Sequence, residues 1–148
     1  ERRIAANREF CIRLDAERAA EAAGPYDFVD EGRGRIAGVP QLVGDFVLAR
    51  RDTPTSYHLA VTVDDHLQGV TQVTRGEDIL PSTHIHVLLQ RLLGYATPLY
   101  AYHPLITDDT GRRLAKRDRD VTVRSLRESG LSPAEVRRRA LAAAGRQA

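Results

Sequence analysis

The fold of this chain is decided by residues 57–94, which read YHLAVTVDDHLQGVTQVTRGEDILPSTHIHVLLQRLLG. At the start of this stretch Leu59, Val63 and Leu67 recur at the spacing of one helix face, and Gly69 follows them. Apolar side chains at this period favour a helix, and a glycine just beyond the last of them is a common helix end. We therefore expect a helix that stops before Gly69.

The rest of the stretch predicts a strand and a second helix. Val70 and Val73 alternate with polar residues over a strand length, as in a strand with one buried face. The segment IHVLLQRLLG is apolar enough for a buried helix, with Ser82 or Thr83 as its N-cap and Gly94 at its end. A helix, a strand and a helix in this order indicate the α/β class.

Further strands are expected on both sides of this stretch. Residues 45–50 and 99–106 are rich in strand formers, whereas residues 26–43 carry several glycines and a proline and are expected to form a loop. Residues 1–24 have no firm period and predict only a helix or strand fragment, broken by Gly24. About three strands are too few for a complete doubly wound domain, so the chain is expected to be the second half of one.

The chain becomes strongly basic after residue 110. Residues 1–110 hold 11 arginines and 16 acidic residues, a net charge of −5, whereas residues 111–148 hold 11 basic and 4 acidic residues, a net charge of +7. Two helices are predicted in this tail, over 123–128 and 133–144, each after a serine or threonine cap. A basic tail on an acidic body is typical of proteins that meet RNA or a nucleotide, although a solvated arginine-rich helix gives the same count.

Lys116 is the only lysine among the 22 basic residues. It lies in the polar segment TDDTGRRLAKRD, residues 107–118, which predicts an exposed loop. A lysine ammonium is a compact charge on a flexible stem, which suits it to follow a moving phosphate. Lys116 is therefore either a residue that binds phosphate or a lysine without a specific role on a solvated loop.

Three segments carry a resemblance to a known family, in the order YHLAVTVDDHLQG, VTQVTRGEDILPSTHIHVLLQRLLG and YHPLITDDTGRRLAKRD. They resemble the latter half of the catalytic domain of glutamyl-tRNA synthetases, which are class I aminoacyl-tRNA synthetases, over about residues 44–130. The resemblance implies the second half of a Rossmann-type catalytic domain followed by a basic helical tail. It divides the chain into a connective segment over 1–43, a catalytic part over 44–110, and a loop with a helical tail over 111–148.

The resemblance also implies an ATP-binding loop. The segment Arg113-Leu114-Ala115-Lys116-Arg117 corresponds to the mobile KMSKS signature of the family. Lys116 is therefore expected to be the catalytic residue that holds the ATP phosphates while pyrophosphate leaves. Arg113 and Ala115 replace the first lysine and the serine of the signature, which keeps the charge and loses a hydroxyl.

Tyr57 and Arg75 are implied as the glutamate-binding residues of the family. The arginine is expected to pair with a substrate carboxylate as a bidentate fork, and the tyrosine to close over the substrate. The residues alone also allow a core aromatic at Tyr57 and a salt bridge from Arg75 to Asp64 or Asp65. Val61 stands where tRNA-charging glutamyl enzymes carry asparagine, a departure that resembles the shorter glutamyl-Q tRNA(Asp) synthetases.

The leading interpretation is an ATP-dependent ligase fragment that activates glutamate with ATP and Mg²⁺ and transfers it to queuosine of tRNA(Asp). The alternatives are a fragment of a tRNA-charging glutamyl-tRNA synthetase and a non-catalytic RNA-binding module with the same fold. The first half of the family's domain, with its phosphate-binding His-Ile-Gly-His motif, has no counterpart here. The sequence is therefore expected to be the C-terminal portion of a longer chain and incomplete for catalysis alone. We expect a cytoplasmic protein, because no apolar run approaches the ~20 residues that span a bilayer, and a monomer is favoured.

Other polar residues predict less chemistry. Asp64 and Asp65 lie about 100 degrees apart on one helix, which favours capping or salt bridges over a shared magnesium ion. Glu77 and Asp78 are left open between a nucleotide or RNA contact and charge compensation at a helix start. Cys11 is the only cysteine and is interpreted as a structural thiol.

The five histidines do not predict a metal site. They are His58, His66, His84, His86 and His103. They are spread over several predicted elements, and two of them, separated by one residue on the second helix, are expected to point apart. Zinc is therefore expected only in the missing upstream part, where related enzymes carry a cysteine cluster.

Overall fold

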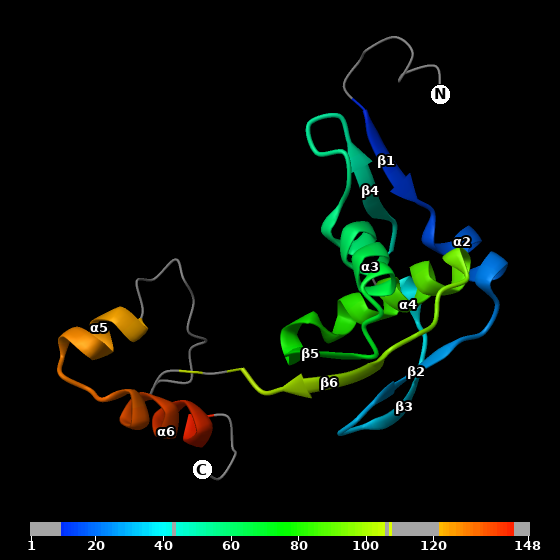
Figure 1. The fold of residues 1–148 in the computed structure, drawn as a ribbon. Coiled ribbons are helices and arrows are strands. Elements are labelled where there is room, and N and C mark those ends of the chain that lie inside the picture. The colour runs from blue at the N-terminus through cyan, green and yellow to red at the C-terminus, as the bar shows by residue number, and fades with distance from the viewer. Residues whose placement is uncertain (1–9, 43, 106, 108–121, 144–148) are drawn as a thin grey trace. The chain divides into compact units, whose positions relative to one another are not determined.

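The computed structural model describes residues 10–42, 44–105, 107 and 122–143. The chain divides into two compact units, of which the first ends at Tyr102 and the second begins at His103 (Figure 1). The first unit combines helices with a sheet, so the predicted α/β class is confirmed.

The first unit contains a four-stranded sheet in the order β3-β2-β6-β5. Its strands are β2 (Asp27–Asp30), β3 (Gly34–Ala37), β5 (Gln72–Gly76) and β6 (Leu99–His103). The inner strand β2 is antiparallel to β3 and parallel to β6, with Asp30 opposite Tyr100. The sheet therefore joins a local hairpin to strands that come much later in the chain.

The prediction of a loop over residues 26–43 is wrong, because β2 and β3 lie there. Phe28 faces Ile36 across the hairpin, and Phe28 is only 1% exposed. Gly34, at φ 77°, opens the second strand in a conformation that L side chains rarely adopt. Two of the glycines that suggested a loop, Gly32 and Gly34, thus lie in and at the end of the tight turn of a hairpin.

Helices are present at both of the positions predicted within residues 57–94. Helix α3 (Tyr57–Leu67) begins at Ser56, whose hydroxyl accepts a hydrogen bond from the backbone N–H of Leu59, and Gly69 follows its end at φ 67°. Helix α4 (Leu80–Leu93) ends at Gly94, which has a φ of 71°. Both glycines end their helices as predicted, because their left-handed conformation is unfavourable for other residues.

The predicted start of α4 is wrong. The helix begins at Leu80, directly after the short 3-10 helix η2 (Glu77–Ile79), and neither Ser82 nor Thr83 caps it. Instead, Thr83 is fully buried one turn inside the helix. Its hydroxyl is used in the candidate site described below.

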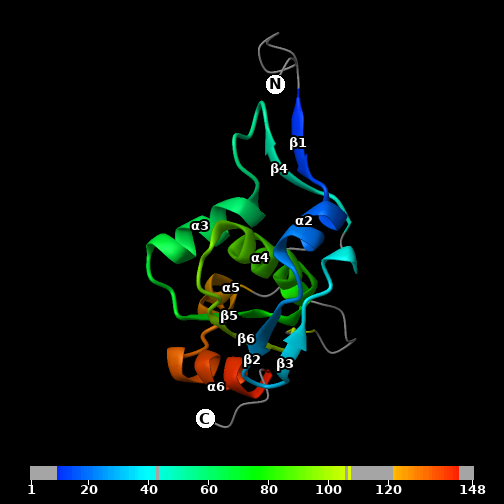
Figure 2. The same cartoon turned by 90° about the vertical axis from the view of Figure 1, so that its right-hand side faces the viewer.

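Helix α4 is the centre of the core. One apolar cluster joins Ile85, Leu88 and Leu89 of α4 to α2 (Ala16–Ala23) and to β4 (Phe46–Arg50). A second cluster joins its Val87 to the sheet through Phe28 and Tyr100. The two views of the first unit agree that α3 and α4 lie on one side of the four-stranded sheet (Figures 1 and 2). Strand β4 also pairs antiparallel with β1 (Cys11–Leu14) in a separate two-stranded sheet.

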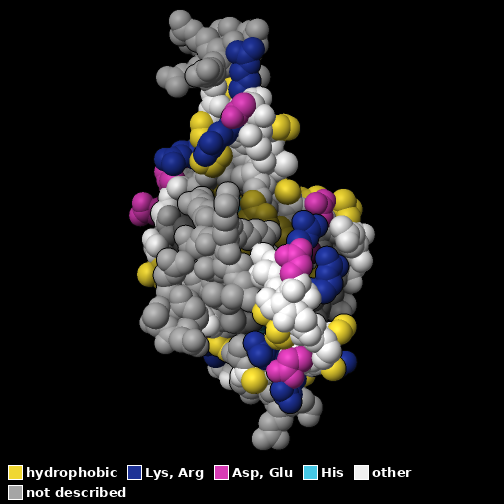
Figure 3. Space-filling model, turned by 90° about the vertical axis from the view of Figure 1, so that its left-hand side faces the viewer, with side chains coloured by type: hydrophobic (Ala, Val, Ile, Leu, Met, Phe, Trp, Pro, Cys, Tyr) yellow, Lys and Arg dark blue, Asp and Glu magenta, His cyan; other side chains and the backbone are white. Residues whose placement is uncertain are grey.

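The second unit contains the two predicted helices, α5 (Val123–Glu128) and α6 (Pro133–Ala143). Thr122 and Ser125 form a capping box at the start of α5. In α6, Glu135 accepts hydrogen bonds from both Arg138 and Arg139, which lower the pKa of its carboxyl. On the face drawn in Figure 3, basic and acidic side chains of the described residues are interspersed. Within the described part of the chain, no helix is long and apolar enough to cross a membrane.

Candidate functional site

Arg75 lies at the C-terminal end of β5 and is the central cation of the candidate site. Its Nη2 donates to the hydroxyl of Thr83 at 2.7 Å, and its Nη1 donates to Nδ1 of His86 at 3.0 Å. The guanidinium carbon lies 5.1 Å from the ring centroid of Tyr100, within cation–π range. Two α4 side chains and an aromatic ring of β6 therefore hold this side chain in one orientation.

Arg75 keeps donors available for a ligand. A guanidinium has five N–H donors, and the two contacts above use two of them. Its Nε is buried and has no hydrogen-bond partner. No ion pair links Arg75 to Asp64 or Asp65 in the described part of the chain, so the salt-bridge alternative for this arginine is wrong. The second N–H group of each terminal nitrogen has no partner among the described residues, and these groups are the donors that suit a substrate carboxylate.

Tyr57 also contacts His86, the imidazole that accepts a hydrogen bond from Arg75. Its ring centroid is 5.8 Å from that of His86, in an edge contact, and the tyrosine is 57% exposed. This exposure excludes the alternative of a core aromatic. The structure thus brings the two predicted glutamate-binding residues, Tyr57 and Arg75, to the same buried imidazole.

A second histidine contacts His86. Nδ1 of His58 lies 3.0 Å from Nε2 of His86, so two of the histidines that the sequence spread over separate elements do meet. Burial, Arg75 and His58 together lower the pKa of His86 to about 3. Burial and then Arg75 also lower the pKa of His58. Both rings are therefore neutral at physiological pH.

The neutral state of His86 predicts a pH dependence of stability. In the unfolded chain this histidine takes up a proton below about pH 6.5, whereas the folded protein resists protonation down to about pH 3. Its contribution to the free energy of unfolding is therefore present above pH 6.5 and is lost as the pH falls. When the pH is lowered from 7 to 5.5, the free energy of unfolding of the full-length wild-type protein is expected to fall by about 1 kcal/mol more than that of a His86→Asn variant. Urea unfolding at both pH values measures this difference, and equal losses in the two proteins contradict it.

Asp65 also lies within electrostatic range of Arg75. Burial raises the pKa of its carboxyl, while the positive charge of Arg75 lowers it and Asp64 raises it. Neither aspartate side chain caps a helix or forms an ion pair in the described residues, so the favoured capping or salt-bridge role is wrong for both. Asp65 instead interacts with Arg75 through its charge, without an ion-pair contact.

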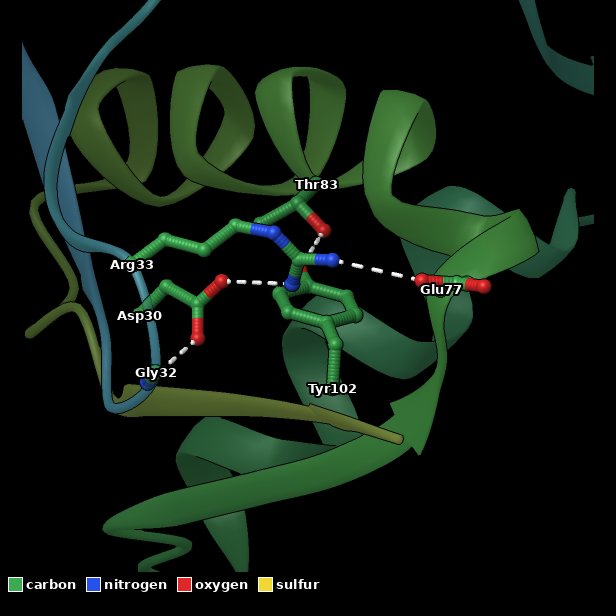
Figure 4. Close-up of polar contacts among 6 residues, drawn as sticks. All are labelled: Asp30, Gly32, Arg33, Glu77, Thr83 and Tyr102. Atoms are coloured by element: carbon green, nitrogen blue, oxygen red, sulfur yellow. Dashed lines mark hydrogen bonds and ion pairs between the residues drawn. The ribbon is translucent and has the colours of Figure 1, made fainter. Parts of the chain in front are cut away.

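A second arginine braces the loop that follows Arg75. Arg33 donates to Asp30 at 2.9 Å and to Glu77 at 3.3 Å, and Figure 4 shows its guanidinium between these two carboxylates. It also lies 5.7 Å from the ring centroid of Tyr102, whose hydroxyl is hydrogen-bonded to Thr83. Glu77, one of the two acidic residues left open by the sequence, is therefore an ion-pair partner of the β2–β3 turn.

A cavity opens beside Tyr57. Its volume is about 380 Å³, which is in the range of small-ligand sites. Residues from β4 and the start of α3 line it, including Phe46, Val47, Arg50, Ser56, Tyr57 and His58. The cavity places hydroxyl groups, a basic side chain and aromatic rings next to the exposed tyrosine.

Sequence reasoning identified Tyr57 and Arg75 but missed their supports. The sequence predicts Thr83 only as a possible helix cap, and it gives His86 no role in a metal site. The described residues contain no group of three or more His, Cys, Asp or Glu side chains that could hold a metal ion. The predicted loop residues Arg113, Leu114, Ala115, Lys116 and Arg117 lie outside the described residues.

The α/β unit, with an arginine held at the end of a strand, has the features expected of a class I aminoacyl-tRNA synthetase. The family described as tRNA synthetases class I (E and Q), catalytic domain, matches residues 1–146. The chain therefore belongs to this family of class I synthetases for glutamate and glutamine.

Individual relatives are similar over most of the chain. It is 49% identical over 134 residues to a glutamyl-Q tRNA(Asp) synthetase of Rhodobacter capsulatus, covering 88% of this chain and 48% of the relative. It is 40% identical over 137 residues to a glutamate–tRNA ligase of Gloeobacter violaceus, covering 93% of this chain and 25% of the relative. The chain thus spans at most about half the length of these relatives.

The fold is also similar to solved structures. A crystal structure of a glutamate tRNA ligase from Elizabethkingia meningosepticum, in complex with its amino acid, superposes with a TM-score of 0.61 and 32% sequence identity. The match covers 80% of this chain and 23% of that protein. These figures confirm that the chain has the fold of part of a class I synthetase.

Proposed function

We propose that this chain is part of a glutamyl-Q tRNA(Asp) synthetase, which activates glutamate with ATP and transfers it to queuosine of tRNA(Asp). The observation that carries the proposal is Arg75, whose two terminal nitrogens are anchored by His86 and Thr83 while each keeps a second N–H group without a partner among the described residues. The 49% identity to a relative of that name supports the choice of subfamily. Val61 supports it too, because tRNA-charging glutamyl enzymes are expected to carry asparagine at this position.

In the proposed reaction, Arg75 binds the side-chain carboxylate of glutamate by its remaining N–H groups. Tyr57 covers the substrate from the exposed side, beside the cavity at the start of α3. Holding the amino acid in this way orients its α-carboxylate for attack on the α-phosphate of ATP, which is a large part of what such an enzyme contributes. The chain's own residues therefore select and orient the amino acid.

ATP is the proposed second substrate, and Lys116 is the residue proposed to bind its phosphates. An ammonium on a flexible stem stabilises the charge of departing pyrophosphate better than it stabilises the ground state. Mg²⁺, when bound, neutralises phosphate charge, and it is expected to be held mainly by the phosphates because it needs few protein ligands. A monomer and a cytoplasmic location stay predictions.

Acylation of three tRNAs tests the proposed substrate. The full-length protein is expected to attach glutamate to tRNA(Asp) that contains queuosine, and not to tRNA(Asp) without it or to tRNA(Glu). Glutamate on tRNA(Glu), with none on the queuosine-containing tRNA, assigns the chain to the runner-up, a tRNA-charging glutamyl-tRNA synthetase. Glutamate on none of the three, with intact tRNA binding, favours the non-catalytic module.

The basic tail provides a separate prediction about RNA. If Arg137, Arg138 and Arg139 contact phosphates, replacing all three by glutamine is expected to weaken tRNA binding and to reduce the slope of log K against log salt by up to ~3. The slope is measured by titration at several salt concentrations. The decrease in the slope is expected to be smaller if the ion pairs of Glu135 persist in the complex, because Arg138 and Arg139 already have that acidic partner. Identical slopes for variant and wild type place the three arginines on a solvated face.

A further inference from the structure

His86 is the side chain that links the two proposed glutamate-binding residues. It is 2% exposed, contacts Arg75 by a hydrogen bond and lies edge-on to Tyr57. It also reaches His58 on α3, so one ring connects α4 to β5 and to α3. Among the described residues, only His86 forms hydrogen bonds or ring contacts with Arg75, Tyr57 and His58 together.

The protons in this network can be placed by elimination. A guanidinium has no acceptor, so Nδ1 of His86 must accept the hydrogen bond from Arg75 and carry no proton. A neutral imidazole then has its proton on Nε2, which donates to Nδ1 of His58. His58 in turn carries its proton on Nε2. The hydrogen bonds therefore run in one direction: Arg75 donates to His86, and His86 donates to His58.

The direction of these hydrogen bonds depends on a neutral His86. A protonated ring has no lone pair for Arg75 and adds a second positive charge 3.0 Å from it. The buried setting of His86 opposes that protonation. In the folded protein Nδ1 of His86 therefore stays unprotonated, and its lone pair stays available to accept the hydrogen bond from Arg75.

We propose that His86 is a positioning residue for glutamate recognition, which with Thr83 fixes the plane of the Arg75 guanidinium. Thr83 anchors Nη2 and His86 anchors Nη1, so rotation about the last bonds of the arginine is blocked at both terminal nitrogens. The second N–H groups of the two terminal nitrogens then keep one orientation before the substrate arrives. This inference rests on the proposed role of Arg75 in binding glutamate. Pre-ordering of this kind lowers the entropy lost on binding.

Two His86 variants and a matched control test the proposal in the full-length enzyme. His86→Leu removes the acceptor, whereas His86→Asn places an amide oxygen close to the position of Nδ1. His84→Leu is the control, because His84 is 5% exposed on the same helix and its Nδ1 also accepts a hydrogen bond, from the backbone of Val39 at 3.1 Å. The control thus loses a buried imidazole that does not touch Arg75.

The readout is the KM for glutamate in glutamate-dependent ATP–pyrophosphate exchange, measured together with kcat, the KM for ATP and the melting temperature. His86→Leu is expected to raise the KM for glutamate roughly 10-fold with kcat changed less than about 3-fold, and His86→Asn to recover most of the loss. His84→Leu is expected to lower the melting temperature while leaving the KM for glutamate within about 2-fold. Equal KM values for the two leucine variants overturn the positioning role.

A spectroscopic measurement separates this inference from the proposed function. Nitrogen-15 spectra of the imidazole rings in the wild-type protein are expected to show a proton on Nε2 and a bare Nδ1 for both His58 and His86. A proton on Nδ1 of His86 overturns the proposal whatever the substrate, and it does so even if His86→Leu does not fold. Correct proton positions combined with an absence of glutamate-dependent exchange in the wild type reject the proposed function instead.

Discussion

Replacing Arg75 with alanine in the full-length enzyme is expected to weaken glutamate binding by ~2 to 4 kcal/mol, because the substrate carboxylate is left without its fork partner. This corresponds to a rise in the KM for glutamate of roughly 30- to 900-fold. The KM for ATP is expected to stay near its wild-type value, since Arg75 contacts α4 and β6 and is proposed to bind only the amino acid. ATP–pyrophosphate exchange at varied glutamate measures both constants.

Two further variants make this result specific. Arg75→Lys is expected to recover only part of the loss, because a point charge cannot donate two parallel hydrogen bonds. Arg35→Ala is the control for removing an arginine from the same unit, since Arg35 is 73% exposed and pairs with Asp27 at the hairpin surface. A KM for glutamate that rises equally in Arg75→Ala and Arg35→Ala removes Arg75 from substrate recognition.

Lys116→Ala is expected to reduce the rate of glutamate-dependent exchange at least ~10-fold, because one charge-assisted contact to the phosphates is lost. The effect is expected in kcat, while the KM for glutamate stays near wild type, since the proposed contact strengthens as pyrophosphate leaves. Single-turnover formation of the adenylate measures the step directly.

The control for Lys116 is Arg124→Ala, which removes an exposed cation from α5 in the same basic tail. Its exchange rate is expected to match that of the wild type. If Lys116→Ala also matches the wild type, the lysine is one of many solvated charges and the proposed ATP-binding loop loses its central residue.

Much of the fold could be predicted where local sequence signals agree with the final packing. Helix α3 is expected from a helical apolar spacing and a following glycine, and both the helix and its glycine end are present, although Leu67 of that spacing is 74% exposed. The hairpin of β2 and β3 could not be predicted from such signals, because glycine and proline serve turns and loops equally well. Its stability comes from Phe28, which is buried against Val87 of α4 and Tyr100 of β6, and these contacts are distant in sequence.

The candidate site could be predicted only in part. Tyr57 and Arg75 were identified from a family resemblance, and the structure brings them to one imidazole. Thr83 and His86 were missed because a threonine before an apolar run is a common helix cap, and a lone histidine in a helix has no distinctive pattern. The signal that could have found them is their spacing of three residues, which puts both on one face of α4 toward β5.

The position of β2 has a consequence for synthesis on the ribosome. Its partner β3 follows within a few residues, but its other partner, β6, pairs through Tyr100, which is made 70 residues after Asp30. At ~5 to 20 residues per second, one edge of the nascent hairpin stays unpaired for roughly 4 to 14 seconds. An open strand edge can pair with a neighbouring chain. The sheet that carries Arg75 is thus completed late in synthesis, and until β6 is made this edge of β2 is open to pairing with a neighbouring nascent chain.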